Sequence, residues 1–155
     1  MKFKIKIITT LLCLLFSSSL VFSQQPSSVI NYDRNPKFIE PKDPYPTVDI
    51  KIIKDNNSGY NVQILTKNFR FTPDKVGTTS IGNEGYATIY VNGKKFRMYG
   101  EWYHITDDIL NEPLNQIRVT LNSNDYFEYA LKQRPIEAIG LIKNEGGSGW
   151  YKNKN

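Results

Sequence analysis

From Thr47 onward, hydrophobic and polar positions alternate with a period of two over most of the chain. Aliphatic and polar side chains take turns in residues 47–52, and again in residues 60–64. Successive side chains of a β-strand point to opposite faces, so this pattern predicts strands with one buried face. A turn cluster, Asn56-Asn57-Ser58-Gly59, separates the two runs. We therefore expect them to form a β-hairpin.

The clearest local signal lies between residues 86 and 99. Asn92-Gly93 is the dipeptide favoured at the two positive-φ positions of a type I′ turn, so it predicts a tight hairpin. In the strand before this turn, small aliphatic residues alternate with Tyr86, Thr88 and Tyr90. If the aliphatic side chains face the core, the two tyrosines face outward.

Further alternating runs cover residues 117–121 and 136–142, and Phe69 and Phe71 are placed to share one face before Pro73. No long helical pattern appears. The chain therefore predicts about seven short strands. We expect an all-β fold, an antiparallel two-sheet sandwich of the immunoglobulin-like or cupredoxin-like kind, with a small barrel as the alternative.

The first residues have the three-part plan of a secretory signal peptide. Lys2, Lys4 and Lys6 precede an uncharged run, residues 7–22, that ends at Ser23. The apolar part of this run is short for a membrane anchor. We expect cleavage after Ser23, a secreted or periplasmic protein, and no membrane span in the mature chain.

The remaining chain divides into three parts by composition. Residues 24–46 contain five prolines and predict an extended tether, because proline fixes φ and lacks an N–H donor. Residues 47–143 form the expected β-sandwich domain. Residues 144–155 include Gly146-Gly147-Ser148-Gly149 and predict a flexible tail.

Composition excludes several function classes. The chain has one His and one Cys, and Cys13 lies in the predicted signal peptide, so zinc clusters, disulfide frameworks and Cys–His catalysis lack their parts. Losing Lys2, Lys4 and Lys6 lowers the formal charge from +5 to +2. Such a charge is no basic footprint, so nucleic acid is not expected as a partner.

Several segments carry a family pattern. They are Asn68–Pro73, Gly85–Lys94, Tyr99–His104, Ile117–Ala130 and Pro135-Ile136. Together they resemble a family of secreted bacterial β-sandwich proteins, largely uncharacterised, whose pattern reads G-H-A-H-L-Y-V-N-G, then Y-G-x-W-Y-H, then N-D-H-x-x-Y-A. The resemblance implies the same sandwich fold.

The chain departs from this pattern where the family carries clustered histidines. Tyr86, Thr88 and Tyr126 stand at those positions, and only His104 is kept. Tyrosine and threonine are poor substitutes for imidazole toward Zn²⁺ or Cu²⁺. We therefore expect no metal site and no cofactor. The alternative is a periplasmic copper-handling protein that uses His104, with Met98 as a soft ligand, although Met98 alternates as a core residue.

The candidate site is a set of aromatic residues and one imidazole. Exposed aromatic rings can stack on sugars or dock a protein. The predicted binding residues are Tyr86, Tyr90, Trp102, His104 and Tyr126. The partner class is an unknown protein or carbohydrate.

Two alternatives bear on catalysis. His104 could instead be a partly buried residue that donates to a carbonyl, or to Asp107 or Asp108. Those two carboxylates and Glu112 cluster in one predicted loop, which does not hold two carboxylates across a cleft as glycosidases require. We expect a protein that is not an enzyme and that has a binding or structural role through a Tyr-rich face and loops.

Overall fold

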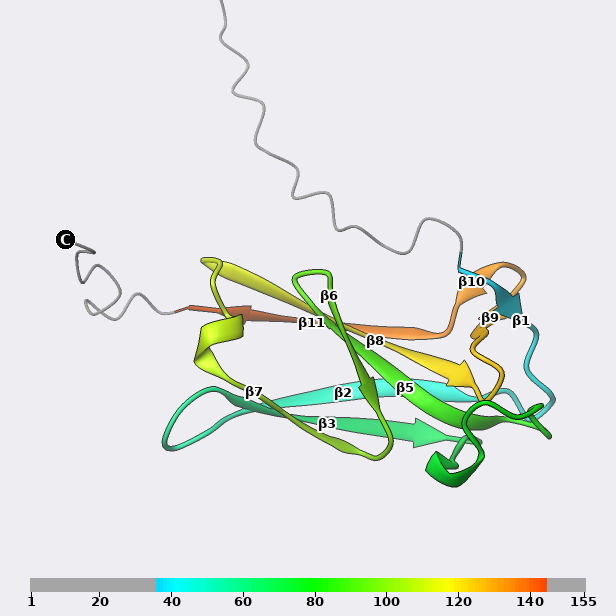
Figure 1. The fold of residues 1–155 in the computed structure, drawn as a ribbon. Coiled ribbons are helices and arrows are strands. Elements are labelled where there is room, and N and C mark those ends of the chain that lie inside the picture. Colours follow the sequence, from blue (N-terminus) through cyan, green and yellow to red (C-terminus); the bar gives the residue numbers. More distant parts are fainter. Residues whose placement is uncertain (1–35, 145–155) are drawn as a thin grey trace, which may run out of the picture.

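The structure, a computed structural model, describes residues 36–144 (Figure 1). The predicted signal peptide and nearly all of the predicted tail lie outside the described residues. The described part is all-β, with eleven strands in one sheet of eight and one of three. It contains two three-residue 3₁₀ turns and no longer helix.

The strands are distributed unevenly between the two sheets. The larger sheet contains β1 (Phe38–Ile39), β4 (Arg70–Phe71), β5 (Glu84–Val91), β6 (Lys94–Met98), β8 (Leu114–Ser123), β9 (Glu128–Leu131), β10 (Arg134–Pro135) and β11 (Glu137–Lys143). The smaller sheet contains β2 (Thr47–Lys54), β3 (Tyr60–Lys67) and β7 (Trp102–Ile105). The 3₁₀ turns are η1 (Pro73–Lys75) and η2 (Asp107–Ile109).

The expected number of about seven strands is wrong. Strands β1, β4 and β10 contain only two residues each. A period of two cannot be recognised in two residues, so alternation does not reveal such strands. The all-β class and the two-sheet arrangement are confirmed.

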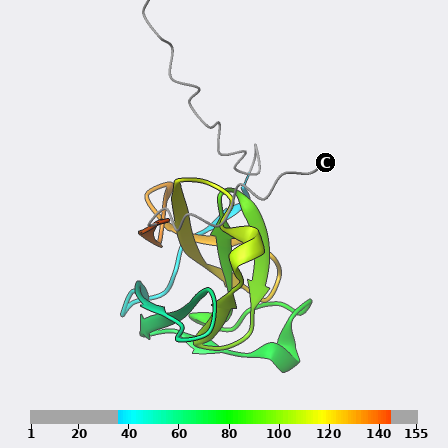
Figure 2. The ribbon, with the colours of Figure 1, turned by 90° about the vertical axis from the view of Figure 1, so that its left-hand side faces the viewer.

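Antiparallel pairing dominates both sheets. In the larger sheet β5 lies between β6 and β8, and β8 pairs on its other side with β11. In the smaller sheet β3 lies between β2 and β7. The two layers lie face to face in a sandwich-like arrangement, as the view from one end shows (Figure 2).

The core fills the space between the two layers. Ala87, Ile89 and Val91 of β5 are buried, as are Val62 and Ile64 of β3. This burial confirms the predicted inward direction of the aliphatic residues of β5. Burying one such aliphatic side chain stabilises a fold by about 1.5–3 kcal/mol. Met98 also belongs to this core, as predicted.

The predicted hairpin turn is confirmed by its backbone. Asn92 has φ 48° and Gly93 has φ 81°, and Val91 pairs with Lys94 across them. Two positive φ values in a two-residue loop are those of a type I′ turn. This turn fixes the register of β5 against β6 and so places the side chains of β6 beside those of β5.

The predicted tether is partly attached to the larger sheet. Phe38 and Ile39 pair with β9 in parallel, and the Glu128 N–H donates to the Lys37 carbonyl at 2.8 Å. Only two residues pair, between Pro36 and Pro41, because proline supplies no N–H donor. From residue 36 onward this segment is therefore packed against the sheet and is not a free linker.

Candidate binding site on the outer face of the larger sheet

The five predicted binding residues lie on two sides of the molecule. Tyr86 and Tyr90 belong to β5 in the larger sheet, and Tyr126 follows β8 of that sheet. Trp102 and His104 belong to β7 in the smaller sheet. The five predicted residues therefore do not form one site, because the chain changes sheets between β6 and β7.

Strand register builds a polar surface on the larger sheet. We define the outer face as the side of β5, β6 and β8 that points away from the core. Tyr90 lies between Lys95 and Arg118 in this register. In the next row Thr88 lies between Arg97 and Thr120, and in the last Tyr86 pairs with Asn122.

The prediction of an exposed tyrosine strip is wrong. Tyr86 is 3% exposed and Tyr90 is 6% exposed, although both point away from the core as expected. The guanidinium of Arg97 lies 4.8 Å from the ring centre of Tyr86, and that of Arg118 lies 4.9 Å from the ring centre of Tyr90. Long side chains from neighbouring strands contribute to this cover. Burial also raises the pKa of Tyr86.

A buried ion cluster occupies one side of the outer face. Arg118 donates to Glu128 Oε1 at 2.6 Å through Nη2, and to Glu137 Oε2 at 2.5 Å through Nε. Burial raises the pKa of Glu128 above its usual range, against the lowering effect of Arg118. The net shift is upward because burial outweighs the attraction of Arg118, and the nearby charge of Glu137 raises the pKa as well. Arg118 is thus the counter-ion of both Glu128 and Glu137.

Asn122 is held by two threonines at the centre of the outer face. The hydroxyls of Thr88 and Thr120 both donate to Asn122 Oδ1, at 2.9 and 3.2 Å. The oxygen of the amide is therefore used inside the sheet. Its NH₂ group is the part of Asn122 that remains for a ligand.

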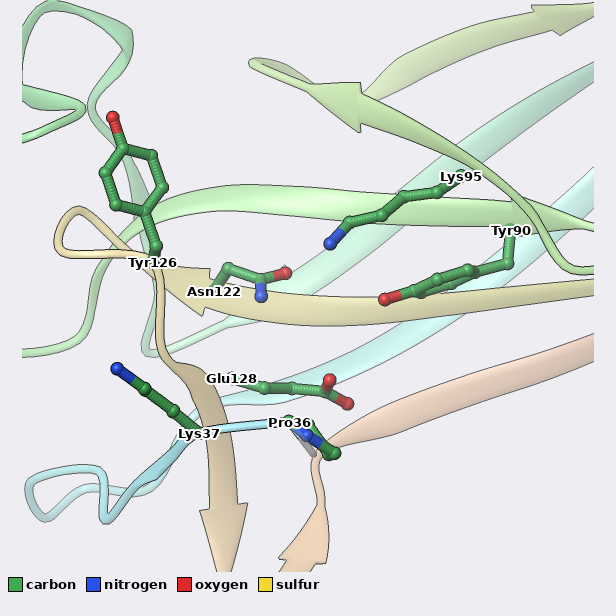
Figure 3. A pocket seen from close by; sticks show the side chains of 7 residues that line it. All are labelled: Pro36, Lys37, Tyr90, Lys95, Asn122, Tyr126 and Glu128. Carbon is green, nitrogen blue, oxygen red and sulfur yellow. The ribbon is translucent and has the colours of Figure 1, made fainter. Parts of the chain in front are cut away.

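A pocket of ≈ 200 Å³ opens over this region (Figure 3). It is lined by Pro36, Lys37, Tyr90, Lys95, Asn122, Tyr126 and Glu128. Figure 3 shows Tyr90 and Lys95 pointing toward Asn122, with Tyr126 and Lys37 at the border. The pocket presents an ammonium group, an amide and a phenol close together. These groups hydrogen-bond polar ligands.

Five of the seven lining residues were missed by reasoning from the sequence, among them Pro36. Lys95 could have been found, because the Asn92-Gly93 turn places it opposite Tyr90. Lys37 and Glu128 are brought together by the pairing of β1 with β9. No local sequence pattern predicts this pairing. Asn122 reads as a turn residue after an alternating run, and only the β5–β8 register places it on the outer face.

On the opposite side of the molecule, Trp102 is 53% exposed and His104 is exposed. His104 Nδ1 lies 2.9 Å from Asn61 Oδ1, and Asn61 Nδ2 donates to Asp55 Oδ2 at 2.9 Å. Since Asn61 turns its oxygen to the imidazole, Nδ1 carries the proton. Hydrogen bonds from the backbone N–H of Asn57 and from Asn61 lower the pKa of Asp55.

The expected partners of His104 are partly wrong. His104 is exposed, and it forms no hydrogen bond with Asp107 or Asp108. Asp107 instead accepts from the Gly59 N–H at 3.0 Å. The partner is the amide carbonyl oxygen of Asn61. Within residues 36–144, no three His, Cys, Asp or Glu side chains come together as metal ligands would.

No protein-family model, curated protein or solved structure matches this chain. In the part of the chain that the structure describes, no helix is long and apolar enough to cross a membrane.

Proposed function

We propose that this protein is a non-catalytic binding protein that takes a polar ligand in the pocket on the outer face of the larger sheet. We further propose that its sandwich is of the immunoglobulin-like or cupredoxin-like kind. The observation that carries the binding proposal is the gathering of Lys37, Lys95 and Asn122 around one pocket. These residues come from three different elements, and each offers N–H donors to a ligand.

The chemistry of the pocket favours binding over catalysis. Its single carboxylate, Glu128, is buried and accepts from Arg118 at 2.6 Å, so it is not available to take a proton from a ligand. Tyr90 is buried and lies against the guanidinium of Arg118. The groups in the pocket are suited to holding a ligand in place.

The test is a binding screen followed by a matched pair of variants. The purified protein is presented with oligosaccharides and peptides, and hits are measured by calorimetry. Lys95→Ala should weaken the affinity for a pocket ligand about tenfold, the loss expected for one charge-assisted hydrogen bond. Lys51→Ala removes the same charge from an exposed position on the smaller sheet and should change nothing. Equal affinities for the two variants would contradict the proposal.

Export is the second part of the proposal. Residues 1–23 have the composition of a signal peptide, so we propose that the working protein is secreted or periplasmic and starts at Gln24. The intact mass of the protein recovered outside the cytoplasm should match a chain that starts at Gln24. Recovery of the chain with Met1 retained would contradict this part.

A copper-handling role through His104 is the second candidate. One observation favours it, namely that Asn61 and Asp55 orient the imidazole and leave Nε2 as its acceptor. A stable Cu²⁺ site usually needs three or four ligands. We therefore expect no binding of Cu²⁺ tighter than micromolar by the monomer. Submicromolar binding that His104→Ala abolishes would favour this candidate over the binding proposal.

A further inference from the structure

Arg97 is held against three tyrosines at the end of the outer face. Its guanidinium carbon lies 4.8 Å from the ring centre of Tyr86 and 5.2 Å from that of Tyr126. Its Nη1 is 3.4 Å from the hydroxyl of Tyr99. The ring centres of Tyr99 and Tyr126 each lie 6.4 Å from that of Tyr86. These contacts fix an exposed cation in one place.

Arg97 has no carboxylate partner among residues 36–144. The ion pairs of this region use Arg70, Lys75 and Arg118 instead. Arginine has five N–H donors in a planar guanidinium, and two of them can donate parallel hydrogen bonds to the two oxygens of a carboxylate. The Tyr99 hydroxyl is the acceptor that Arg97 has within the described chain. A guanidinium that is fixed but has no counter-ion is suited to a ligand anion, because less side-chain entropy is lost on binding.

The backbone of Tyr126 supports this interpretation. Tyr126 has φ 71°, in the left-handed region that bulky residues avoid and that glycine or asparagine usually occupies. Its N–H donates to the Ser123 carbonyl at 3.1 Å, which closes the turn. A tyrosine in this position costs conformational energy and places an aromatic ring over Arg97. Strained residues of this kind concentrate at functional sites.

The pocket and the Arg97 cluster form one continuous surface. Tyr126 contacts Arg97 and also lines the pocket. Lys95 and Arg97 point to the same side of β6, two residues apart, so their Cα atoms are separated by about 6.8 Å. Lys37 adds a further cation at the border. Arg118 pairs with both Glu128 and Glu137, and Lys37, Lys95 and Arg97 add three positive charges, so these six side chains carry a net charge of +2.

We propose that the outer face binds an acidic saccharide through its carboxylate groups. This inference rests on the proposed binding function and names its ligand class. Arg97 holds one carboxylate by its fork, and Lys95 pairs with a second charge or a ring hydroxyl. The exposed rings of Tyr99 and Tyr126 cover the apolar C–H face of the sugar. The Asn122 NH₂ group donates to a hydroxyl inside the pocket.

The experiment compares a charged probe with its neutral counterpart. Calorimetry with the purified protein at low and high salt uses tri-galacturonate and galactotriose as probes. We expect tri-galacturonate to bind at least tenfold more tightly, with an affinity that falls as salt rises. Arg97→Lys keeps the charge, removes the fork, and should weaken tri-galacturonate binding about tenfold.

Two further variants keep the test decisive. Arg134→Lys is the matched control, because Arg134 is an exposed arginine on β10 outside the tyrosine cluster, and it should leave the affinity unchanged. In Tyr126→Gly the glycine adopts the positive φ of this position without strain, and the aromatic ring is lost. This variant should therefore bind more weakly while it stays folded. Melting temperatures confirm that each variant is folded.

The possible failures can be told apart. If galactotriose binds as tightly as tri-galacturonate and Arg97→Lys leaves both unchanged, the acidic-saccharide inference is wrong while the binding function stands. If polyglutamate binds more tightly than tri-galacturonate, the ligand is an acidic protein and the inference is again wrong. If the pocket binds no probe of the screen, both proposals fail together.

Discussion

Gly85 offers the sharpest test of how the larger sheet is built. It pairs with Ser123 across β5 and β8 and has φ 150°, a conformation that side chains rarely adopt. A Cβ atom at this position would lie 2.0 Å from the carbonyl oxygen of Asn122. That oxygen belongs to the backbone of the central strand, so it cannot turn away as a flexible side chain would. We predict that Gly85→Ala is strongly destabilising.

The magnitude follows from the geometry. A carbon and an oxygen in contact are normally about 3.3 Å apart, so β8 would have to move about 1.3 Å away from β5. Hydrogen bonds lengthened by that amount are lost. The loss of two ladder bonds costs about 2 kcal/mol, and the strained φ costs a further 1–3 kcal/mol. A total of about 3–5 kcal/mol lowers the melting temperature of a domain of this size by about 12–20 °C.

Thermal unfolding followed by far-ultraviolet circular dichroism is the assay. Gly100→Ala is the matched control, because no atom lies within 4 Å of a Cβ at Gly100. It should change the free energy of unfolding by less than about 1 kcal/mol, with stabilisation the favoured direction. If the two variants melt within about 3 °C of each other, the close approach of β5 and β8 at Gly85 is refuted.

Three further predictions concern the hairpin, the ion cluster and the stability of the fold at acidic pH. Gly93→Val places a β-branched residue at positive φ and should cost about 1–3 kcal/mol in a melting experiment. Arg118→Met leaves Glu128 buried without its guanidinium and should cost about 3–5 kcal/mol in urea unfolding, and adding Glu128→Gln should recover part of the loss. Burial raises the pKa of Glu84, but hydrogen bonds from Arg70, the Ile81 backbone N–H and Lys75 lower it by a larger amount. The net pKa of Glu84 therefore lies below the usual 4.5. The ionised form of Glu84 therefore stabilises the fold above pH 4.5, and this contribution is lost as the pH falls through the lowered pKa. Glu84→Gln should have a lower melting temperature than the unmodified protein at pH 7. Its melting temperature should also fall less on acidification.

The core of the fold could be predicted because its signal is local. Ala87, Ile89 and Val91 alternate with polar residues, and the same rule describes Val62 and Ile64 of β3. One buried face is enough to impose a period of two. The short strands escaped the prediction because two residues have no period. The distribution of strands between the two sheets depends on contacts between distant segments, and alternation contains no information about these.

The candidate site could be predicted only in part, for a different reason. The direction of Tyr86 and Tyr90 follows from alternation, and it is correct. Their burial depends on Arg97 and Arg118, long side chains that lie across neighbouring strands. Alternation assigns each residue to a face but does not say which long side chains cover that face. The burial of Tyr86 and Tyr90 therefore could not be predicted from alternation alone.

The outer face is hard to explain as a device for stability. A buried ion pair contributes little net stability, and well-packed apolar residues in its place often stabilise a protein by 1–4 kcal/mol. The fold nevertheless buries Arg118 with Glu128, and it places Tyr126 in a strained conformation over Arg97. The cations Lys37 and Lys95 line the pocket on this same face. A strained tyrosine and a buried ion pair beside a cationic pocket support the proposal that this face recognises a charged ligand.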